Sequence, residues 1–362
     1  MTVRDALVMP PTESAMIQAC GVRGADGWVG HAATWRGRRP MMVPPETAPR
    51  PAARLEGRYM WCGQLWAHFG HFLCESMARI WGLAEAGRLD GLIFIAKRPG
   101  RIERLKGWQK EFLDLLGIDL PVIVVSAPTE VAELVVPGQG FGLGRIDRAT
   151  PEFRAFFHDR FCRDVAAEGP KKLYLSRSAL GGLEGSVILE ERLEARLSAA
   201  GYEIFHPQKH TVAEQVAHYR AATHVLGLDG SAFHMFGFVA RADQKAAVIL
   251  RRNSTVPNGL VHQIEAFSGR RPDVIAHVVA DWVPRHKGRA GRYSFGQLDM
   301  AAVAAELQEL GYIDNAADWT VPRFREVKSA IEGFGAAKDL QFMRKLRKPG
   351  MPAVEGLQTD AA

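Results

Sequence analysis

Residues 173–177, LYLSR, and residues 210–231, HTVAEQVAHYRAATHVLGLDGS, decide the fold of this chain. LYLSR is a short apolar strand that ends in a hydroxyl and an arginine. The second stretch predicts a helix, then an apolar strand, then a glycine turn that opens another helix. Open α/β sheets bind ligands at the edge formed by the carboxyl ends of their strands. These stretches therefore predict a ligand-binding edge suited to the phosphates and ribose of a nucleotide.

The alternation of strands and helices continues on both sides of this region. In the second half we predict helix 187–200, strand 202–207, helix 211–222, strand 223–228, a helix from about Gly230 and strand 245–251. In the first half we predict a substantial helix that begins between His68 and His71, strand 91–97, helix 103–118, strands 121–127 and 132–138, and helix 151–169. This alternation is typical of parallel sheets with right-handed crossovers.

Two such series in tandem, with a boundary near residues 166–172, predict an α/β fold of two Rossmann-like domains whose parallel sheets face a cleft. The predicted parts are an N-terminal domain, 1–168, with an extended and partly irregular lead-in; a C-terminal domain, 169–330; and a basic, partly disordered tail, 331–362.

Composition narrows the class of protein. The 362 residues are 47% hydrophobic and carry 46 basic against 40 acidic side chains. Neither an apolar run of 18 residues nor a signal-peptide pattern occurs, so we expect a soluble cytoplasmic protein, with peripheral attachment to the inner membrane as the alternative. The dispersed basic residues disfavour nucleic-acid binding. Widely spaced cysteines without a CxxC pair predict reduced thiols at Cys20, Cys62, Cys74 and Cys162.

Polar residues at the predicted strand end and helix start are candidates for ligand binding. Ser176 and Arg177 end the strand LYLSR, and an arginine there can hold a diphosphate bidentately. A surface salt bridge and a turn serine explain the same pair equally well. Thr211 and Glu214 form a T-x-x-E capping box, which accounts for both residues as helix-end groups. The alternative is that Glu214 accepts hydrogen bonds from a ribose diol.

The glycine turn GLDGS is the second candidate region. Gly230 and Ser231 let backbone amides approach a phosphate at a helix N-terminus. Asp229 is an unsuitable neighbour for a pyrophosphate, so we expect it to face a sugar hydroxyl, a backbone amide or the cleft. His234 on the following helix is interpreted as a buried, hydrogen-bonded histidine, with a substrate contact as the alternative. The turn lacks the G-x-S-x-G elbow of serine hydrolases.

The predicted helix of the first half carries a candidate general base. His71, Glu75 and Arg79 are spaced i, i+4, i+8 and would share one helix face, with His68 one turn earlier. A carboxylate four residues from an imidazole can orient it and raise its basicity, which suits deprotonation of a hydroxyl. A structural ion-paired face is one alternative. Zinc at the HxxH pair is another, but no third ligand stands at an interpretable spacing.

These blocks together resemble glycosyltransferase family 61, to which capsular polysaccharide biosynthesis enzymes of bacteria belong. The resemblance covers about residues 60–252, and the blocks that carry it are HFGHFLCESMARIWGL, KEFLDLLGI, LYLSR, TVAEQVAHYRAATHVLGLDGSAFHMFGF and AAVIL. Glu190 stands where the family has a glutamate. Leu189 replaces a common asparagine, Asp229 a common histidine, and His234 a second asparagine.

The resemblance implies a GT-B-like arrangement with a nucleotide-sugar donor held mainly by the C-terminal domain. It implies transfer of a hexosyl or pentosyl group to a glycan or polysaccharide hydroxyl, inversion at the anomeric carbon, and no obligatory metal or other cofactor. On this view His71 is the base, oriented by Glu75, and Asp229 is the reserve candidate. Substrate contacts would come from His68, Arg79, Ser176, Arg177, Glu214, Gly230, Ser231 and His234.

Two alternatives to this function stay open. A polysaccharide pyruvyl transferase-like enzyme shares the tandem Rossmann plan but would use phosphoenolpyruvate. A non-catalytic nucleotide-sugar-binding protein would fit the altered positions Asp229 and His234. The sequence leaves the donor, acceptor, linkage and oligomeric state undefined.

Overall fold

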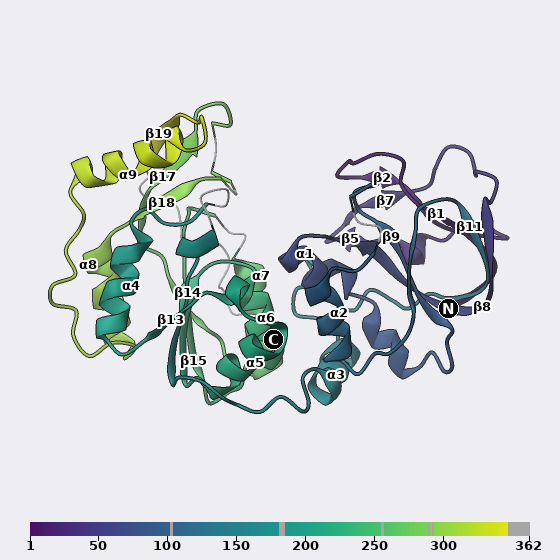
Figure 1. Cartoon of the computed structure of the whole chain (residues 1–362), viewed down its shortest axis with the longest axis horizontal. Coiled ribbons are helices and arrows are strands. Elements are labelled where there is room, and N and C mark those ends of the chain that lie inside the picture. Colours follow the sequence, from purple (N-terminus) through teal and green to yellow (C-terminus); the bar gives the residue numbers. More distant parts are fainter. Residues whose placement is uncertain (102–103, 181–184, 255–256, 289, 292, 347–362) are drawn as a thin grey trace, which may run out of the picture. The chain divides into compact units, whose positions relative to one another are not determined.

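The computed structural model of the protein describes residues 1–101, 104–180, 185–254, 257–288, 290–291 and 293–346. The chain divides into two compact units (Figure 1). Unit 1 comprises Met1–Val165 with Gly237–Val239, and unit 2 comprises Ala166–Phe236 with the residues from Ala240 onward. The domain boundary between residues 168 and 169 stays a prediction, because a compact unit need not be an independently folding domain.

A seven-stranded mixed sheet is the framework of unit 1, in the order β10-β9-β8-β11-β1-β3-β4. Its strands are β1 (Thr2–Met9), β3 (Gly21–Gly24), β4 (Gly27–Trp28), β8 (Ala53–Leu65), β9 (Gly91–Ala96), β10 (Val122–Val125) and β11 (Thr129–Val135). Strands β10, β9, β8 and β11 pair in parallel, whereas β1 is antiparallel to β11 and β3. The prediction of an all-parallel sheet is therefore wrong for unit 1.

The first 56 residues differ from the expected irregular lead-in, because they supply strands to this sheet. In β1 the side chains of Val3, Ala6 and Val8 are buried in the core of unit 1. Asp5, with φ of 46°, interrupts the strand's alternation, which makes the apolar pattern hard to recognise. Pairing with β11 then satisfies the backbone of β1 along most of its length.

Short elements complete unit 1. They are β2 (Gln18–Ala19), β5 (Trp35–Arg36), β6 (Arg39–Pro40), β7 (Met42–Val43), α1 (Phe69–His71), a π-helical turn (Phe72–Ser76), 3-10 turns (Gly30–Ala32 and Ile80–Ala84), α2 (Gly107–Asp114) and α3 (Pro151–Arg160). The long helix predicted from about residue 68 is thus a series of short helical turns of different pitch. Ser76 Oγ contacts the backbone of both Gln64 and Trp66, which ties this series to the end of β8.

Helix α3 ends at Arg160 rather than near residue 169. Phe161 is extended, and its ring centroid lies 4.7 Å from that of Phe112 in α2. Cys162 follows with φ of 55°, which a continuing helix could not accommodate. Burial of the Phe161 ring outweighs continuation of the helix.

Unit 2 is built on a five-stranded parallel sheet in the order β13-β12-β14-β15-β16. Its strands are β12 (Lys172–Leu175), β13 (Glu203–Phe205), β14 (His224–Leu228), β15 (Lys245–Ile249) and β16 (Asp273–Ile275). The parallel sheet predicted for the second half is confirmed. If the five strands are numbered by their order in the chain, their order across the sheet is 2-1-3-4-5, a doubly wound arrangement. The direction in which successive strands are added switches between β12 and β14. Such sheets hold ligands at that switch point.

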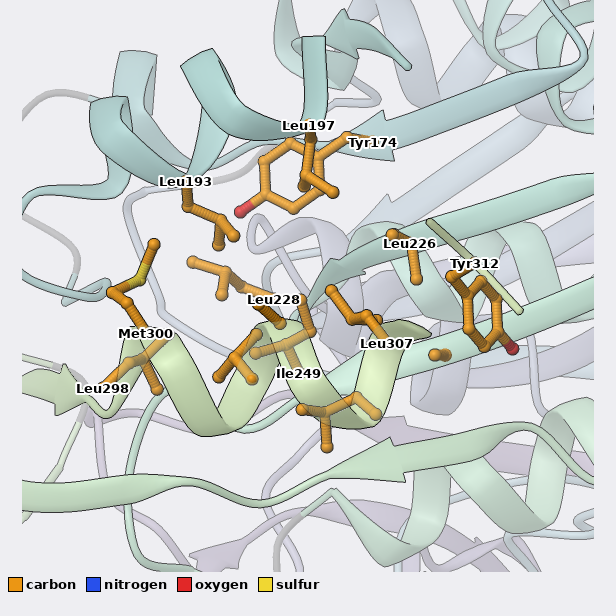
Figure 2. Packing of buried hydrophobic residues seen from close by; sticks show 14 of the residues in the cluster. Tyr174, Leu193, Leu197, Leu226, Leu228, Ile249, Leu298, Met300, Leu307 and Tyr312 are labelled. Atoms are coloured by element: carbon orange, nitrogen blue, oxygen red, sulfur yellow. The ribbon is translucent and has the colours of Figure 1, made fainter. Parts of the chain in front are cut away.

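Helices pack apolar side chains against this sheet. They are α4 (Glu190–Ala199), α5 (Val212–Ala221), α6 (Ala232–Val239), α7 (Asn258–Ser268) and α8 (Met300–Glu309), with 3-10 turns at Ser178–Leu180 and Pro207–Lys209. Figure 2 shows the cluster that α4 and α8 form with the strands. Its labelled side chains are Tyr174, Leu193, Leu197, Leu226, Leu228, Ile249, Leu298, Met300, Leu307 and Tyr312.

A three-stranded antiparallel sheet and helix α9 (Phe324–Ala336) follow. The sheet order is β18-β17-β19, formed by Val278–Pro284 (β17), Phe295–Leu298 (β18) and Phe342–Leu346 (β19). The predicted tail, 331–362, includes the end of α9 and all of β19. Its partial disorder was expected in the last residues, of which 347–362 lie outside the described residues. Val327 and Ile331 of α9 are buried in a cluster with Trp282 and Phe295, which explains the order.

The cysteines are all buried free thiols, which confirms the prediction of reduced cysteines. Burial raises the pKa of Cys20 to about 12, and it also raises the pKa values of Cys62 and Cys74. These thiols are therefore poor nucleophiles. Across the described part of the chain, no helix has the length and apolar character needed to span a membrane.

Candidate functional site

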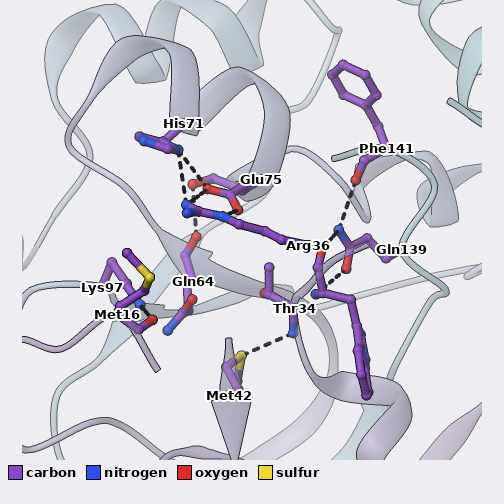
Figure 3. A network of polar contacts seen from close by, with 12 residues as sticks. Met16, Thr34, Arg36, Met42, Gln64, His71, Glu75, Lys97, Gln139 and Phe141 are labelled. Carbon is purple, nitrogen blue, oxygen red and sulfur yellow. Dashed lines mark hydrogen bonds and ion pairs between the residues drawn. The ribbon is translucent and has the colours of Figure 1, made fainter. Parts of the chain in front are cut away.

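The candidate base of unit 1 lies beside Trp66, the first residue after β8. The His71 ring stacks on the Trp66 indole at a centroid distance of 4.3 Å. Two cations also lie over this indole: the Arg36 guanidinium carbon at 5.4 Å and Lys97 Nζ at 5.2 Å from the ring centroid. Figure 3 shows Arg36, Lys97, His71 and Glu75 in this region. Lys97 directly follows β9, so the cluster lies at the carboxyl edge of two parallel strands.

Glu75 links the histidine to an arginine. Its side chain is 1% exposed, and its Oε2 lies 2.8 Å from His71 Nδ1. Arg36 donates to both carboxylate oxygens, from Nε to Oε1 at 2.6 Å and from Nη2 to Oε2 at 2.8 Å. Burial by itself would raise the pKa of Glu75, but hydrogen bonds and positive charge from Arg36, assisted by His71, lower it below its ordinary value. Glu75 is therefore ionised near neutral pH.

The ionised carboxylate selects the tautomer of His71. A carboxylate only accepts hydrogen bonds, so the proton of the neutral imidazole is assigned to Nδ1, which donates to Glu75 Oε2. The other ring nitrogen, Nε2, then carries the lone pair. The side chain is 31% exposed, so this lone pair can serve a substrate. His71 thus has the tautomer of a general base.

The other residues predicted for this face behave differently. The His68 ring packs edge-on against His71 with a centroid distance of 5.2 Å, so the structure brings these two histidines together. Arg79 is buried, and its guanidinium donates to the carbonyl oxygens of Pro137, His31 and Ala33. Burial lowers the pKa of Arg79 to about 10. The predicted common face does not extend to Arg79, because the helical pitch changes between residues 72 and 84.

Arg36 and Lys97 are residues that sequence reasoning missed. Lys97 Nζ donates to Met16 O at 2.8 Å, and burial lowers the Lys97 pKa to about 8. A lysine closing the apolar strand GLIFIAK was a signal that could have drawn attention to it. Arg36 had no comparable signal, because it lies 39 residues from Glu75 in a segment with no clear periodicity.

In unit 2, the switch point brings Arg177 and Gly230 together. Arg177 follows β12, and Gly230 follows β14. These two neighbouring strands flank the point at which the order of the strands reverses. A Cβ built on Gly230 would lie 2.6 Å from Arg177 Nη1, so the guanidinium rests against the glycine turn. Ser231 is the N-cap of α6, and its hydroxyl makes no capping bond. The predicted cluster of arginine, glycine turn and helix start is thus present.

Carboxylates hold the backbone beneath Arg177. Glu190 Oε1 accepts from Arg177 N at 2.7 Å, and Glu190 Oε2 accepts from Ser186 Oγ at 2.5 Å. Burial raises the pKa of Glu190 despite these hydrogen bonds. The Ser176 hydroxyl donates to Glu194, which also accepts from Ser178 Oγ at 2.6 Å. Ser176 therefore helps to shape the turn, which was the alternative to a direct ligand contact.

Asp229 is engaged with Arg251. Its Oδ1 accepts from Arg251 Nε at 2.9 Å, and its Oδ2 accepts from Arg251 N at 2.9 Å. Both side chains are less than 10% exposed. Arg251 Nη1 and Arg177 Nη2 both donate to Gly185 O, at 2.8 and 3.3 Å. Sequence reasoning missed this second arginine, and Asp229 serves as its counter-ion.

Glu214 forms the predicted capping box, whereas His234 is hydrogen-bonded as interpreted but only partly buried. Glu214 Oε2 accepts from Thr211 N at 2.8 Å, and Thr211 Oγ1 accepts from Glu214 N at 3.2 Å, so the capping box is formed. The His234 imidazole contacts Gln263 Oε1 at 2.7 Å, and Gln263 Nε2 donates to His234 O at 2.9 Å. Gln263 is fully buried. His234 therefore fastens α6 to α7.

A comparison with protein families identifies the family of the chain. The model of the family described as Glycosyltransferase 61 matches residues 69–249, half of the chain, from α1 to the end of β15. The chain belongs to glycosyltransferase family 61. As a family 61 glycosyltransferase it transfers a sugar, and donor and acceptor substrates are implied. A search of curated proteins found no match. Arg36 and Arg251 lie outside the span of this glycosyltransferase match.

The HxxH pair, His68 and His71, is the alternative zinc site that the sequence suggested. Within the described ranges of this glycosyltransferase, no group of three or more His, Cys, Asp or Glu side chains is arranged to hold a metal ion. The ring of His71 instead hydrogen-bonds to Glu75 and stacks on Trp66.

Proposed function

We propose that this glycosyltransferase is an inverting, metal-independent enzyme that moves a hexosyl or pentosyl group from a nucleotide sugar to a hydroxyl of a glycan or polysaccharide. The observation that carries the proposal is the His71–Glu75 pair at 2.8 Å, with Glu75 ionised by Arg36. This arrangement supplies a proton acceptor, which transfer to a hydroxyl requires. Asp229 is the weaker candidate, because both of its oxygens are bound to Arg251.

The donor site is proposed at the switch point of unit 2. The diphosphate of the donor would be held by Arg177 and by the backbone amides of Gly230 and Ser231 at the start of α6. Arg251 adds a second guanidinium close to Arg177, as their shared acceptor, Gly185 O, indicates. Its charge is largely balanced by Asp229, so Arg177 is the principal cation.

The reaction follows from these two groups. His71 Nε2 takes the proton of the acceptor hydroxyl as its oxygen attacks the anomeric carbon. The bond from that carbon to the donor's diphosphate oxygen breaks, and the nucleoside diphosphate leaves with the bonding electrons. Arg177 stabilises the charge that develops on this leaving group. A single displacement from the opposite face inverts the anomeric configuration.

The first test is a thermal-shift screen of the full chain with UDP, GDP, CDP and ADP, each with and without Mg²⁺. A ligand at a hundred times its Kd stabilises the folded state by about 2.7 kcal/mol, which a melting curve resolves. We expect one nucleotide to raise Tm without metal, and Arg177→Ala to abolish the rise. Arg241→Ala is the matched control, because Arg241 precedes β15 at the opposite edge of the sheet.

The second test examines the transfer itself. Sugars of the stabilising nucleotide are supplied as donors, and the anomeric configuration of the product is determined by NMR. Inversion and full activity in EDTA are expected. Retention of configuration, or loss of activity in EDTA, would contradict the proposed mechanism. Stabilisation by phosphoenolpyruvate and by no nucleotide would favour the pyruvyl transferase alternative.

A further inference from the structure

We infer that Arg36 is a positioning residue, which holds Glu75 as a carboxylate and thereby keeps the His71 proton on Nδ1 and the lone pair on Nε2. The inference rests on the proposed role of His71 as the base. It extends the site beyond the segment matched by the family model, which begins at residue 69. It also gives a role to the β5–β6 hairpin (Trp35–Arg36 and Arg39–Pro40), which the proposed reaction leaves unexplained.

The geometry of the ion pair carries the first step. Arg36 binds Glu75 with Nε and Nη2 at 2.6 and 2.8 Å, one nitrogen to each oxygen. A bidentate pair of this kind fixes the plane of the carboxylate as well as its charge. Glu75 Oε2 is then directed at His71 Nδ1. The Glu75 side chain is 1% exposed, so water cannot stabilise its negative charge as the arginine does. The ionisation of Glu75 therefore depends on Arg36.

The second step concerns the proton. If Glu75 were protonated, its hydroxyl would donate to Nδ1, and the imidazole proton would move to Nε2. That tautomer cannot accept a proton from a substrate at Nε2. Arg36 Nη2 also lies 3.4 Å from Nδ1, so the arginine contacts both members of the pair. Arg36 thereby keeps the proton of the neutral imidazole on Nδ1 and leaves Nε2 available.

The other charged and titratable groups that face Glu75 do not replace Arg36. Lys97, after β9, contributes positive charge, but its Nζ is bound to Met16 O. Cys74, on the same helical segment, has a thiol whose pKa burial raises, so it is uncharged. His68 packs on the edge of the His71 ring at a centroid distance of 5.2 Å. Arg36 makes two direct hydrogen bonds to Glu75, one to each carboxylate oxygen.

The glycine-rich segment 139–145, QGFGLGR, braces the arginine. Gln139 Oε1 accepts from Trp35 N at 2.8 Å, and Gln139 Nε2 donates to Trp35 O at 3.0 Å and to Phe141 O at 3.2 Å (Figure 3). Gly144 has φ of 92°, and a Cβ there would lie 2.6 Å from Gly37 N. The segment therefore packs directly on the hairpin that carries Arg36. It acts in unit 1 as a support for this hairpin.

The test reads the imidazole directly and needs no substrate. The full-length protein is labelled with ¹⁵N-histidine, and the Nδ1 and Nε2 resonances of His71, identified from a His71→Gln spectrum, are followed from pH 5 to pH 9. In the wild type we expect the Nδ1–H tautomer. In Arg36→Met the His71–Glu75 pair should take up its proton about one pH unit or more higher, because an adjacent arginine typically shifts a carboxyl by one to three units.

Controls separate positioning from folding. Arg58→Met removes another arginine of unit 1 that is paired with a glutamate, Glu133, at 2.6 Å, and should leave His71 unchanged. Arg36→Lys keeps the charge and should recover part of the shift, while Gln139→Leu should move the midpoint in the same direction by less. If Arg36→Met does not fold, Arg36→Lys and Gln139→Leu test the role of Arg36 in its place.

The outcomes distinguish this inference from the proposed function. An unmoved midpoint in Arg36→Met, or an equal shift in Arg58→Met, would overturn the role of Arg36 whatever His71 does in the reaction. Full transfer activity in His71→Ala would overturn the proposed base, even if the NMR shift appears as expected. A shifted midpoint together with an inactive His71→Ala supports both.

Discussion

At the residue scale, the structure separates groups that are free to react from groups that are already bound. His71 and Asp229 were both candidates for the base. The His71 side chain is partly exposed beside an ionised glutamate, whereas Asp229 neutralises a buried arginine. Residue type and position along the chain were equally suitable in both cases. The partner of each side chain favours His71 as the proposed base.

The His71 assignment predicts a large kinetic defect without a binding defect. His71→Ala should lower kcat roughly 10²- to 10⁴-fold, the usual cost of removing a general base. Nucleotide binding should persist, because the proposed donor contacts lie in unit 2. The turnover of His71→Ala is measured with the donor found by the thermal-shift screen. It is compared with the turnover of the control variant His286→Ala. Retention of more than about a tenth of wild-type kcat would refute the assignment.

Asp229 predicts the opposite pattern, a loss of stability. Asp229→Asn removes the charge that balances buried Arg251, which should lower the free energy of unfolding by about 3 kcal/mol or more. Urea denaturation measures this change. The double variant Asp229→Asn/Arg251→Met should recover part of the loss, because it removes the unpaired charge. Unchanged stability combined with lost turnover would instead indicate that Asp229 is the base.

At the scale of elements, the turn between β14 and α6 depends on close approach. Gly230 was expected to permit backbone contact with a phosphate. In the structure a Cβ on Gly227 would lie 2.8 Å from Leu175 Cβ, and one on Gly230 would meet Arg177 Nη1. The first glycine is needed for packing between strands. The second leaves room for the arginine.

Gly230→Ala should therefore impair binding more than folding. The added methyl group displaces the flexible end of Arg177, which can move at little cost to stability. Nucleotide affinity should fall roughly tenfold, equivalent to about 1.4 kcal/mol. Isothermal titration with the nucleotide from the screen measures it. Gly333→Ala, where the Cβ meets nothing within 4 Å, is the control and should bind normally.

The elements of unit 2 were more predictable than those of unit 1. Strands β12, β14 and β15 are apolar runs followed by helices, so their period and order could be inferred. The short helical turns of residues 69–84 could not be inferred in this way. Ser76 is hydrogen-bonded to the end of β8, and Arg79 donates to three backbone carbonyl groups. Long-range hydrogen bonds there override local helix propensity.

At the scale of the whole molecule, buried carboxylates make stability depend on pH. The pKa of Glu75 is lowered on folding, so its contribution is fully present above its unfolded value of about 4.5 and is lost as pH falls through the folded value. Below about pH 4.5 the unfolded chain binds a proton that folded Glu75 does not. Glu190, whose pKa is raised, has the opposite sign.

Urea unfolding between pH 3 and pH 6 tests this linkage. The wild type should lose stability as the pH falls below about 4.5. Glu75→Gln should be less stable at pH 6, because Arg36 loses its counter-ion, but its further loss on acidification should be smaller. Parallel slopes for the two proteins would show that Glu75 has the same pKa in the folded and unfolded chain.

The sequence by itself determined the α/β character, the parallel sheet of unit 2, the capping box at Thr211 and the glycine turn at Gly230. Each of these depends on residues that are near one another in the chain, whose period and backbone preferences act locally. The tertiary structure alone decided that Arg36 binds Glu75, that Arg251 binds Asp229, and that β1 joins the sheet. Buried charges and strand backbones must find partners, and the choice among distant partners depends on how the whole unit packs.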